Sequence, residues 1–134
     1  MNDPIINKLV TVERCLQRIT KVYQEAGNNF KQDYTRQDSV ILNLQRACEA
    51  CIDLANIINK QKQTGIPQNS RDSFALLARA DLLPLPLSES LQKMVGLRNI
   101  AVHDYQTLNL DIVIHVVEHR LGDFSDFCEH IKRL

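Results

Sequence analysis

The chain has 134 residues, 44% of them hydrophobic, which suits one domain with a single core and leaves no room for a second folded unit of ordinary size, so we expect one domain over residues 1–134. Its 16 Lys and Arg balance 16 Asp and Glu, so any affinity for nucleic acid must come from a local cluster of cations and not from the net charge. The first nine residues lack the apolar run of a secretion signal, and no apolar stretch approaches the roughly 20 residues of a membrane span, which predicts a cytoplasmic protein without a membrane partner.

Two long helices are predicted in the first half of the chain. Apolar residues recur at steps of four and three over residues 5–23, and Gly27-Asn28-Asn29 is expected to end that helix. Thr35, with Asp38 three positions later, resembles a capping box and predicts the start of a second helix that continues through Ile58. Additional apolar residues widen the stripe of this second helix, so we expect it to lie centrally, in contact with neighbours on two sides.

A short helix is predicted next. Gly65-Ile66-Pro67 breaks the chain, and either Asn69 or Ser70 can cap a third helix. Pro84 and Pro86 are expected to close it.

Two further long helices complete the prediction. Ser88 is expected to open a fourth helix that continues into residues 98–105, and Asn109 can cap a last helix whose apolar residues step by four or three over residues 113–131. No alternating segment bounded by turn residues indicates a strand. The predicted fold class is therefore all-α, an up-and-down bundle of four long helices and one short helix.

Residues 98–105, Arg-Asn-Ile-Ala-Val-His-Asp-Tyr, hold the one group of side chains suited to a reaction. Cleavage of RNA by a ribose 2′-hydroxyl needs a base for the hydroxyl proton and a cation for the charge that develops on the phosphate. His103 can exchange protons near neutral pH, and the planar guanidinium of Arg98 matches phosphate oxygens. Asn99 can add a hydrogen bond, and Tyr105 can stack on a base or present its hydroxyl. This scheme requires no metal and no cofactor.

Arg98 and His103 lie about 140° apart around an ideal helix axis, so a single straight helix would aim them differently. Either the helix ends near His103 and its ring turns back, or two copies of the segment face each other across a dimer. A structural alternative stays open on spacing alone, in which Arg98 and Asp104 are surface charges, His103 is a satisfied histidine at a helix end and Tyr105 is a core or interface aromatic.

The order Arg98, four residues, His103, one residue, Tyr105 resembles the Arg-x4-His-x-Tyr motif of HepT-type toxins in the HEPN superfamily. Residues 44–55 resemble the second helix of that family, and residues 65–67 and 71–74 resemble its following loop and third helix. The resemblance covers nearly the whole chain, without a departure at the motif positions.

The resemblance implies a dimeric helical bundle with a catalytic cleft at the subunit interface and a metal-independent endoribonuclease activity toward cellular tRNA or mRNA. Arg98 and His103 would be catalytic, with Asn99 and Tyr105 in support. As the toxin of a type VII toxin–antitoxin pair, it would be neutralised when an MntA-like nucleotidyltransferase antitoxin transfers AMP to Tyr105, since a bulky, charged adenylate would fill the cleft and repel RNA. The competing hypotheses are a non-catalytic substrate-binding or scaffolding subunit of a nucleotidyltransferase and a purely structural interaction protein.

Charged residues outside the motif are weaker candidates. Glu49 and Asp53 share one face of the second helix with Arg46, and they can shape the cleft or an antitoxin interface or simply form a solvated face. A cationic track for RNA would combine Arg98 with three further cations, against the alternative of scattered surface charges: Arg71, Arg79 and Lys93.

Cysteine and histidine pairs do not match a metal site. Cys48 and Cys51 fall on an apolar stripe and lack two further ligands at zinc spacing, so we expect them to be reduced core residues, as we expect reduced thiols at Cys15 and Cys128. A pair of histidines, His115 and His119, is one turn apart on the last helix, but no third ligand is evident and we expect no metal there.

Overall fold

The computed structural model describes residues 2–134, so Met1, the first residue of the expected domain, lies outside the described part. Within residues 2–134 the chain forms helices and no strand, which confirms the all-helical class. Six α-helices and two short 3-10 helices follow in the order α1 Asp3–Ala26, η1 Gly27–Gln32, α2 Tyr34–Lys62, α3 Ser70–Arg79, α4 Leu85–His103, η2 Tyr105–Thr107, α5 Leu110–His119 and α6 Leu121–Lys132. None of these helices has the length and apolar character needed to span a bilayer.

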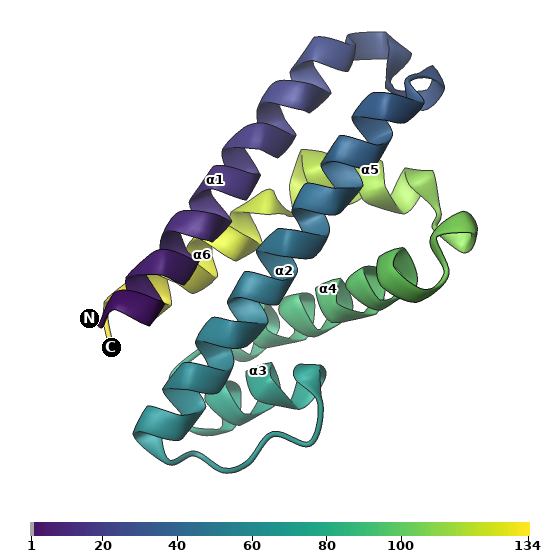
Figure 1. Cartoon of the computed structure of the whole chain (residues 1–134). Coiled ribbons are helices and arrows are strands. Elements are labelled where there is room, and N and C mark those ends of the chain that lie inside the picture. The colour runs from purple at the N-terminus through teal and green to yellow at the C-terminus, as the bar shows by residue number, and fades with distance from the viewer. Residues whose placement is uncertain (1) are drawn as a thin grey trace.

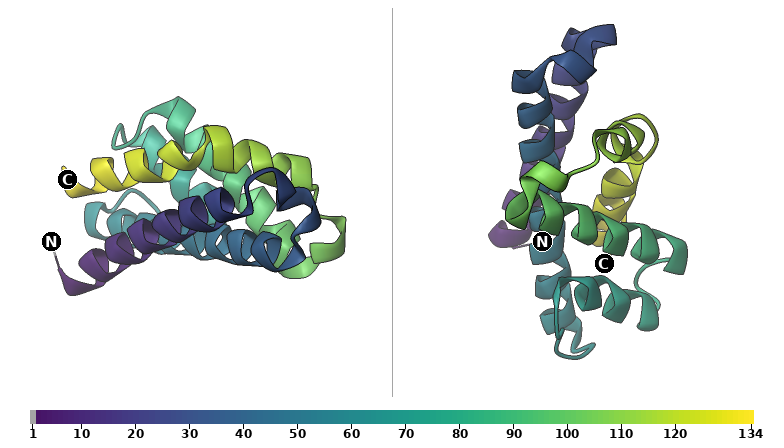
Figure 2. Two further views of the ribbon diagram at one scale, coloured as in Figure 1. Left: turned by 90° about the horizontal axis from the view of Figure 1, so that it is seen from above. Right: turned by 90° about the vertical axis from the view of Figure 1, so that its right-hand side faces the viewer.

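The long antiparallel hairpin of α1 and α2 forms one side of the molecule, and α3, α4 and α6 pack against it (Figures 1 and 2). Because α2 packs against α1, α3, α4 and α6, it buries apolar residues on more than one side and occupies the central position predicted from its wide stripe. Its fully buried residues include Val40, Ala47, Cys51, Leu54 and Ala55. Gly27, at φ 54°, ends α1 as expected, since a residue without a side chain adopts this conformation at little cost.

The predicted capping box of the second helix is wrong. Asp33 is the N-cap of α2, because its Oδ1 accepts a hydrogen bond from the backbone N–H of Arg36 at 3.0 Å. Thr35 therefore lies inside the helix. An aspartate is as effective a cap as a threonine, and here it comes first along the chain.

Two other predicted helix boundaries also need correction. The fourth helix begins at Leu85 and not at Ser88, because Pro86 is tolerated in a first turn where its missing N–H needs no partner. The expected single last helix is divided into α5 and α6 at Arg120, whose φ of −126° leaves the helical range. The cap at Asn69 is confirmed, since its side chain accepts from the backbone of Asp72 at 2.8 Å.

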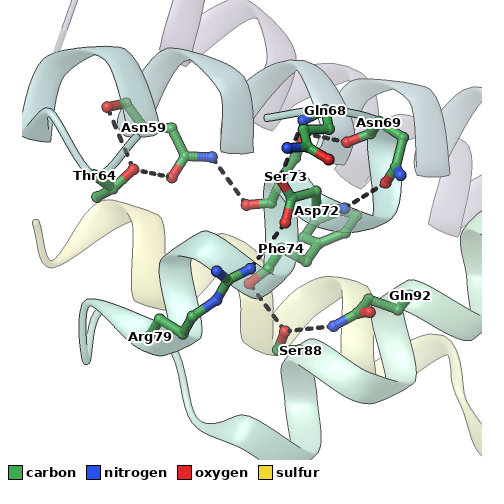
Figure 3. Close-up of polar contacts among 10 residues, drawn as sticks. All are labelled: Asn59, Thr64, Gln68, Asn69, Asp72, Ser73, Phe74, Arg79, Ser88 and Gln92. Carbon is green, nitrogen blue, oxygen red and sulfur yellow. Dashed lines mark hydrogen bonds and ion pairs between the residues drawn. The ribbon is translucent and has the colours of Figure 1, made fainter. Parts of the chain in front are cut away.

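Buried polar contacts fasten α3 between α2 and α4 (Figure 3). The side-chain amide of Asn59 on α2 donates to the carbonyl of Ser73 on α3 at 2.9 Å, and its Oδ1 accepts from the hydroxyl of Thr64. From the other side, the hydroxyl of Ser88 on α4 donates to the carbonyl of Phe74 at 2.9 Å. The contacts that Asn59 and Ser88 make with the backbone of α3 hold this helix against both α2 and α4.

We predict that Asn59→Ala lowers the free energy of unfolding by about 2 kcal/mol, because it removes one buried and one partly buried hydrogen bond and leaves the Ser73 carbonyl without its Asn59 partner. Urea denaturation followed by circular dichroism measures this. Asn29→Ala, at an exposed position in η1, is the control and should change stability by less than about 0.5 kcal/mol. Equal effects of the two substitutions would show that the Asn59 contacts do not hold α3.

Candidate active site

The motif residues span the end of α4 and the short η2 that follows it. His103 is the last residue of α4, and Asp104 leaves the helix at φ −152° while its N–H still bonds to the carbonyl of Ile100 at 2.8 Å. Of the two routes considered from the sequence, the first requires the helix to end near His103, and α4 does end at this residue. The side chains of Asn99 and His103 are exposed.

Arg98 lies half-buried between three helices. Its side chain borders a small hollow with Leu44, Gln45 and Cys48 of α2, and its Nη2 donates to the hydroxyl of Ser70, at the start of α3, at 3.2 Å. The Nε atom is buried without a hydrogen-bond partner, and no ion pair among residues 2–134 involves this guanidinium. A permanent charge with unused donors in a partly desolvated place is suited to receive an anion such as a phosphate.

Tyr105 is held by a partner that the linear motif does not contain. Its hydroxyl donates to Oδ1 of Asp38 on α2, although 44% of the residue remains exposed. Burial is the largest cause that raises the pKa of Tyr105 to about 12, followed by the hydrogen bond to Asp38 and the negative charge of that carboxylate. The hydroxyl therefore stays protonated at neutral pH and points at a fixed acceptor.

Within residues 2–134, the two catalytic candidates Arg98 and His103 form no hydrogen bond or ion pair with each other. His103 does not line the small hollow that Arg98 borders. Arg98 is engaged with Ser70 and the side of α2, whereas Tyr105 is engaged with Asp38. Within residues 2–134, Arg98 and Tyr105 therefore have different hydrogen-bond partners.

The three charged candidates on α2, which are Arg46, Glu49 and Asp53, differ in their contacts. Asp53 forms an ion pair with Lys8 of α1, Oδ2 to Nζ at 2.8 Å. In the described part of the chain Glu49 and Arg46 form no ion pair, and Arg46 borders a groove between α1 and α2.

The expected cationic track is only partly assembled. Arg79 is occupied by an ion pair with Asp72 at 2.8 Å. Arg71 lies against α4, where a side chain added at Gly96 would come within 2.8 Å of its guanidinium. The absence of a side chain at Gly96 thus lets Arg71 approach the helix that carries Arg98.

All four cysteines are buried, which confirms Cys48 and Cys51 as core residues. Burial raises the pKa of Cys48 to about 12, and Arg98 opposes that rise through its charge. The rings of His115 and His119 lie 5.1 Å apart on exposed positions of α5. Residues 2–134 contain no group of three His, Cys, Asp or Glu side chains placed to hold a metal ion.

Comparisons with known proteins agree on one family. The sequence model of the family described as Ribonuclease HepT-like matches residues 12–131. The chain is 67% identical over 132 residues to a protein named mRNA nuclease HepT from Shewanella oneidensis, which covers 98% of each sequence.

Solved structures give the same result. The chain matches a chain from a complex of tri-AMPylated Shewanella oneidensis HEPN toxin with MNT antitoxin at a TM-score of 0.95 and 66% identity, over the whole of both chains. It also matches a chain from a toxin–antitoxin crystal structure with AMP-PNP at a TM-score of 0.92 and 66% identity, over 98% of this chain and 99% of that chain.

We predict that Asp38→Asn lowers the pKa of Tyr105 from about 12 toward the ordinary value of about 10, without reaching it, because burial remains the larger cause. A Tyr23→Phe/Tyr34→Phe background leaves Tyr105 as the single tyrosine, so the absorbance of the phenolate reports it alone. Glu118→Gln in the same background removes a carboxylate that contacts Tyr23 in the native chain and does not act on the pKa of Tyr105, so it should leave the transition in place. A transition that stays near 12 in Asp38→Asn would contradict the assigned contact.

Proposed function

This chain belongs to the ribonuclease HepT-like family, and from that premise we propose that it is the toxin of a toxin–antitoxin pair and a metal-independent endoribonuclease that uses Arg98 and His103. The observation that supports this proposal most strongly is the half-buried Arg98 guanidinium, with a buried Nε that has no partner in the chain. A guanidinium that forms no ion pair within residues 2–134 keeps its full positive charge for an anionic ligand. The substrate we propose is cellular mRNA or tRNA, encountered in the cytoplasm.

In the proposed reaction the ribose 2′-oxygen attacks the adjacent phosphorus as its proton passes to the imidazole of His103. The bond from phosphorus to the 5′-oxygen breaks, and that oxygen takes up a proton as it leaves. Arg98 stabilises the negative charge on the phosphate oxygens while five bonds surround the phosphorus, and the exposed Asn99 amide can hold the ribose or a second phosphate. Products of this step are a cyclic phosphate and a 5′-hydroxyl.

We propose that the complete site forms between two copies of the chain. In one chain the Arg98 and His103 side chains share no hollow, and the same stretch exposes two apolar residues, Ile100 at 41% and Val102 at 44%. A second copy packed against the end of α4 would cover these residues and bring its His103 to the Arg98 of the first copy. Self-complementary contacts of this kind are characteristic of two-fold dimers.

The proposed antitoxin is an MntA-like nucleotidyltransferase that transfers AMP to Tyr105. The tyrosine oxygen would attack the α-phosphorus of ATP, so that an oxygen–phosphorus bond forms and pyrophosphate leaves, while the phenolic proton passes toward Asp38. The contact with Asp38 supports this assignment, since it holds the hydroxyl in one orientation at an exposed position. An adenylate there would add bulk and negative charge beside the motif and so repel RNA.

We predict that Arg98→Ala and His103→Ala each reduce the rate of RNA cleavage at least about 100-fold. A positioned proton acceptor, or a positive group that stabilises the developing negative charge, contributes about that much to a reaction rate. The assay is incubation of AMP-free protein with total RNA in excess EDTA, in which the wild type should remain active. Circular dichroism establishes that each variant is folded, and His119→Ala, exposed on α5, should cleave normally. Wild type that leaves RNA intact, or His103→Ala that cleaves as well as wild type, would contradict the proposal.

A further inference from the structure

A groove between α1 and α2 concentrates positive charge that the proposed cleavage chemistry does not use. Its volume is about 480 Å³, and it is bordered by Arg14 and Arg18 of α1 and by Arg46 of α2. Asp38 borders it as well. A neighbouring hollow of about 390 Å³ shares Arg14 and Arg18 and adds Lys21. We call these two hollows together the arginine groove.

Within residues 2–134, the arginine groove is bordered by four cations and two carboxylates. In the described part, Arg14, Arg18, Lys21 and Arg46 take part in no ion pair. The two carboxylates that border the groove are Asp38 and Glu25, and the latter lies 3.9 Å from a different arginine, Arg36.

The positive charge of the groove also affects the pKa of the neighbouring Cys15 thiol. Burial raises the pKa of Cys15, and the charges of Arg46, Arg18 and Arg14 all act in the opposite direction. Unpaired cations around a concave surface attract anions in spite of a net charge of zero for the whole chain.

Tyr105 contacts a residue that lines the arginine groove. The Tyr105 hydroxyl donates to Asp38, and Asp38 is part of the groove lining, so a phosphorus atom attached to this oxygen would lie at the groove rim. Attachment removes the proton that Asp38 accepts and places a negative phosphodiester beside its carboxylate. Repulsion from Asp38 and attraction to the arginines both direct the attached group into the groove.

We propose that the arginine groove binds the phosphodiester groups of a nucleotide strand, which are the AMP units on Tyr105 in the modified protein and the RNA backbone in the unmodified protein. Arg14 and Arg18 lie one helical turn apart on the same face of α1, so their guanidinium groups can hold successive phosphates. The AMP units would then occupy the arginine groove and exclude the RNA backbone from it, in addition to covering Tyr105. The part of this inference that concerns AMP rests on the proposed function, and the part that concerns RNA does not depend on Tyr105.

Binding of a labelled oligodeoxyadenylate of about six nucleotides tests the groove alone, because DNA lacks the 2′-hydroxyl and cannot be cleaved by the proposed reaction. Fluorescence anisotropy should show at least about tenfold weaker binding for Arg14→Gln/Arg18→Gln, and the slope of log affinity against log salt should fall by about 1.4, since each single-strand phosphate contact contributes about 0.7. Lys60→Gln/Lys62→Gln removes the same charge from the far end of α2 and should bind like wild type. Equal affinities and slopes for the two variants would overturn the groove as a binding site.

A second experiment uses the protein that carries AMP on Tyr105 and tests whether the arginine groove binds the AMP units. Each variant is co-expressed with its antitoxin, and mass spectrometry of the Tyr105 peptide establishes that AMP is attached. A phosphodiesterase should then release AMP several-fold faster from Arg14→Gln/Arg18→Gln than from wild type or Lys60→Gln/Lys62→Gln, because the strand is no longer held. Wild type without AMP on Tyr105 would contradict the proposed regulation, whereas attached AMP released at equal rates would overturn the groove as its binding site.

Discussion

The burial of the Arg98 guanidinium between α2 and the start of α3 is the constraint on which the candidate site depends. The residue can occupy this position because α4 packs against α2, and because buried hydrogen bonds at Ser73 and Phe74 hold α3 in place so that Ser70 meets the arginine. The same packing of α4 brings Tyr105 to Asp38. A structural core of ordinary apolar helices thus places a charged group in a partly desolvated position, which is where the attraction of an arginine for phosphate is strongest.

The distribution of charge explains how a chain with no net charge can act on a polyanion. Several exposed acids and bases form ion pairs, as Lys8 does with Asp53 and Arg79 with Asp72. Within residues 2–134, Arg98 and the cations of the arginine groove form no ion pair. Tyr105 adjoins this positive region through Asp38, so a negative group attached to Tyr105 would act on the surface that RNA is proposed to use.

Regular periodicity predicted most of the fold from the sequence, and its failures have local causes. The stripe of α2 indicated a central helix, and Asn69 was correctly predicted as a cap, because both depend on neighbours close in sequence. The break at Arg120 was not predicted, since the apolar steps continue through it without a glycine or proline at the break. The start of α4 was missed because Pro86 serves as a first-turn residue.

The candidate site could be predicted only as far as its linear motif extends. Arg98, His103 and Tyr105 lie within eight consecutive residues, and their types indicate phosphate chemistry. Asp38 and Ser70 were not predicted as partners, because they are 67 and 28 residues away from the side chains that they contact and no spacing rule links them. Which arginines stay unpaired is likewise decided by the packing of α1 on α2.

The central claim is that a complete active site takes Arg98 from one copy of the chain and His103 from another. Mixing the inactive Arg98→Ala and His103→Ala proteins, with exchange of subunits verified by differently tagged copies, tests it most directly. A shared site predicts that cleavage returns to about a quarter of the wild-type specific activity, because half of the dimers are mixed and each mixed dimer holds one intact site. Mixed dimers that form and remain inactive would contradict the claim.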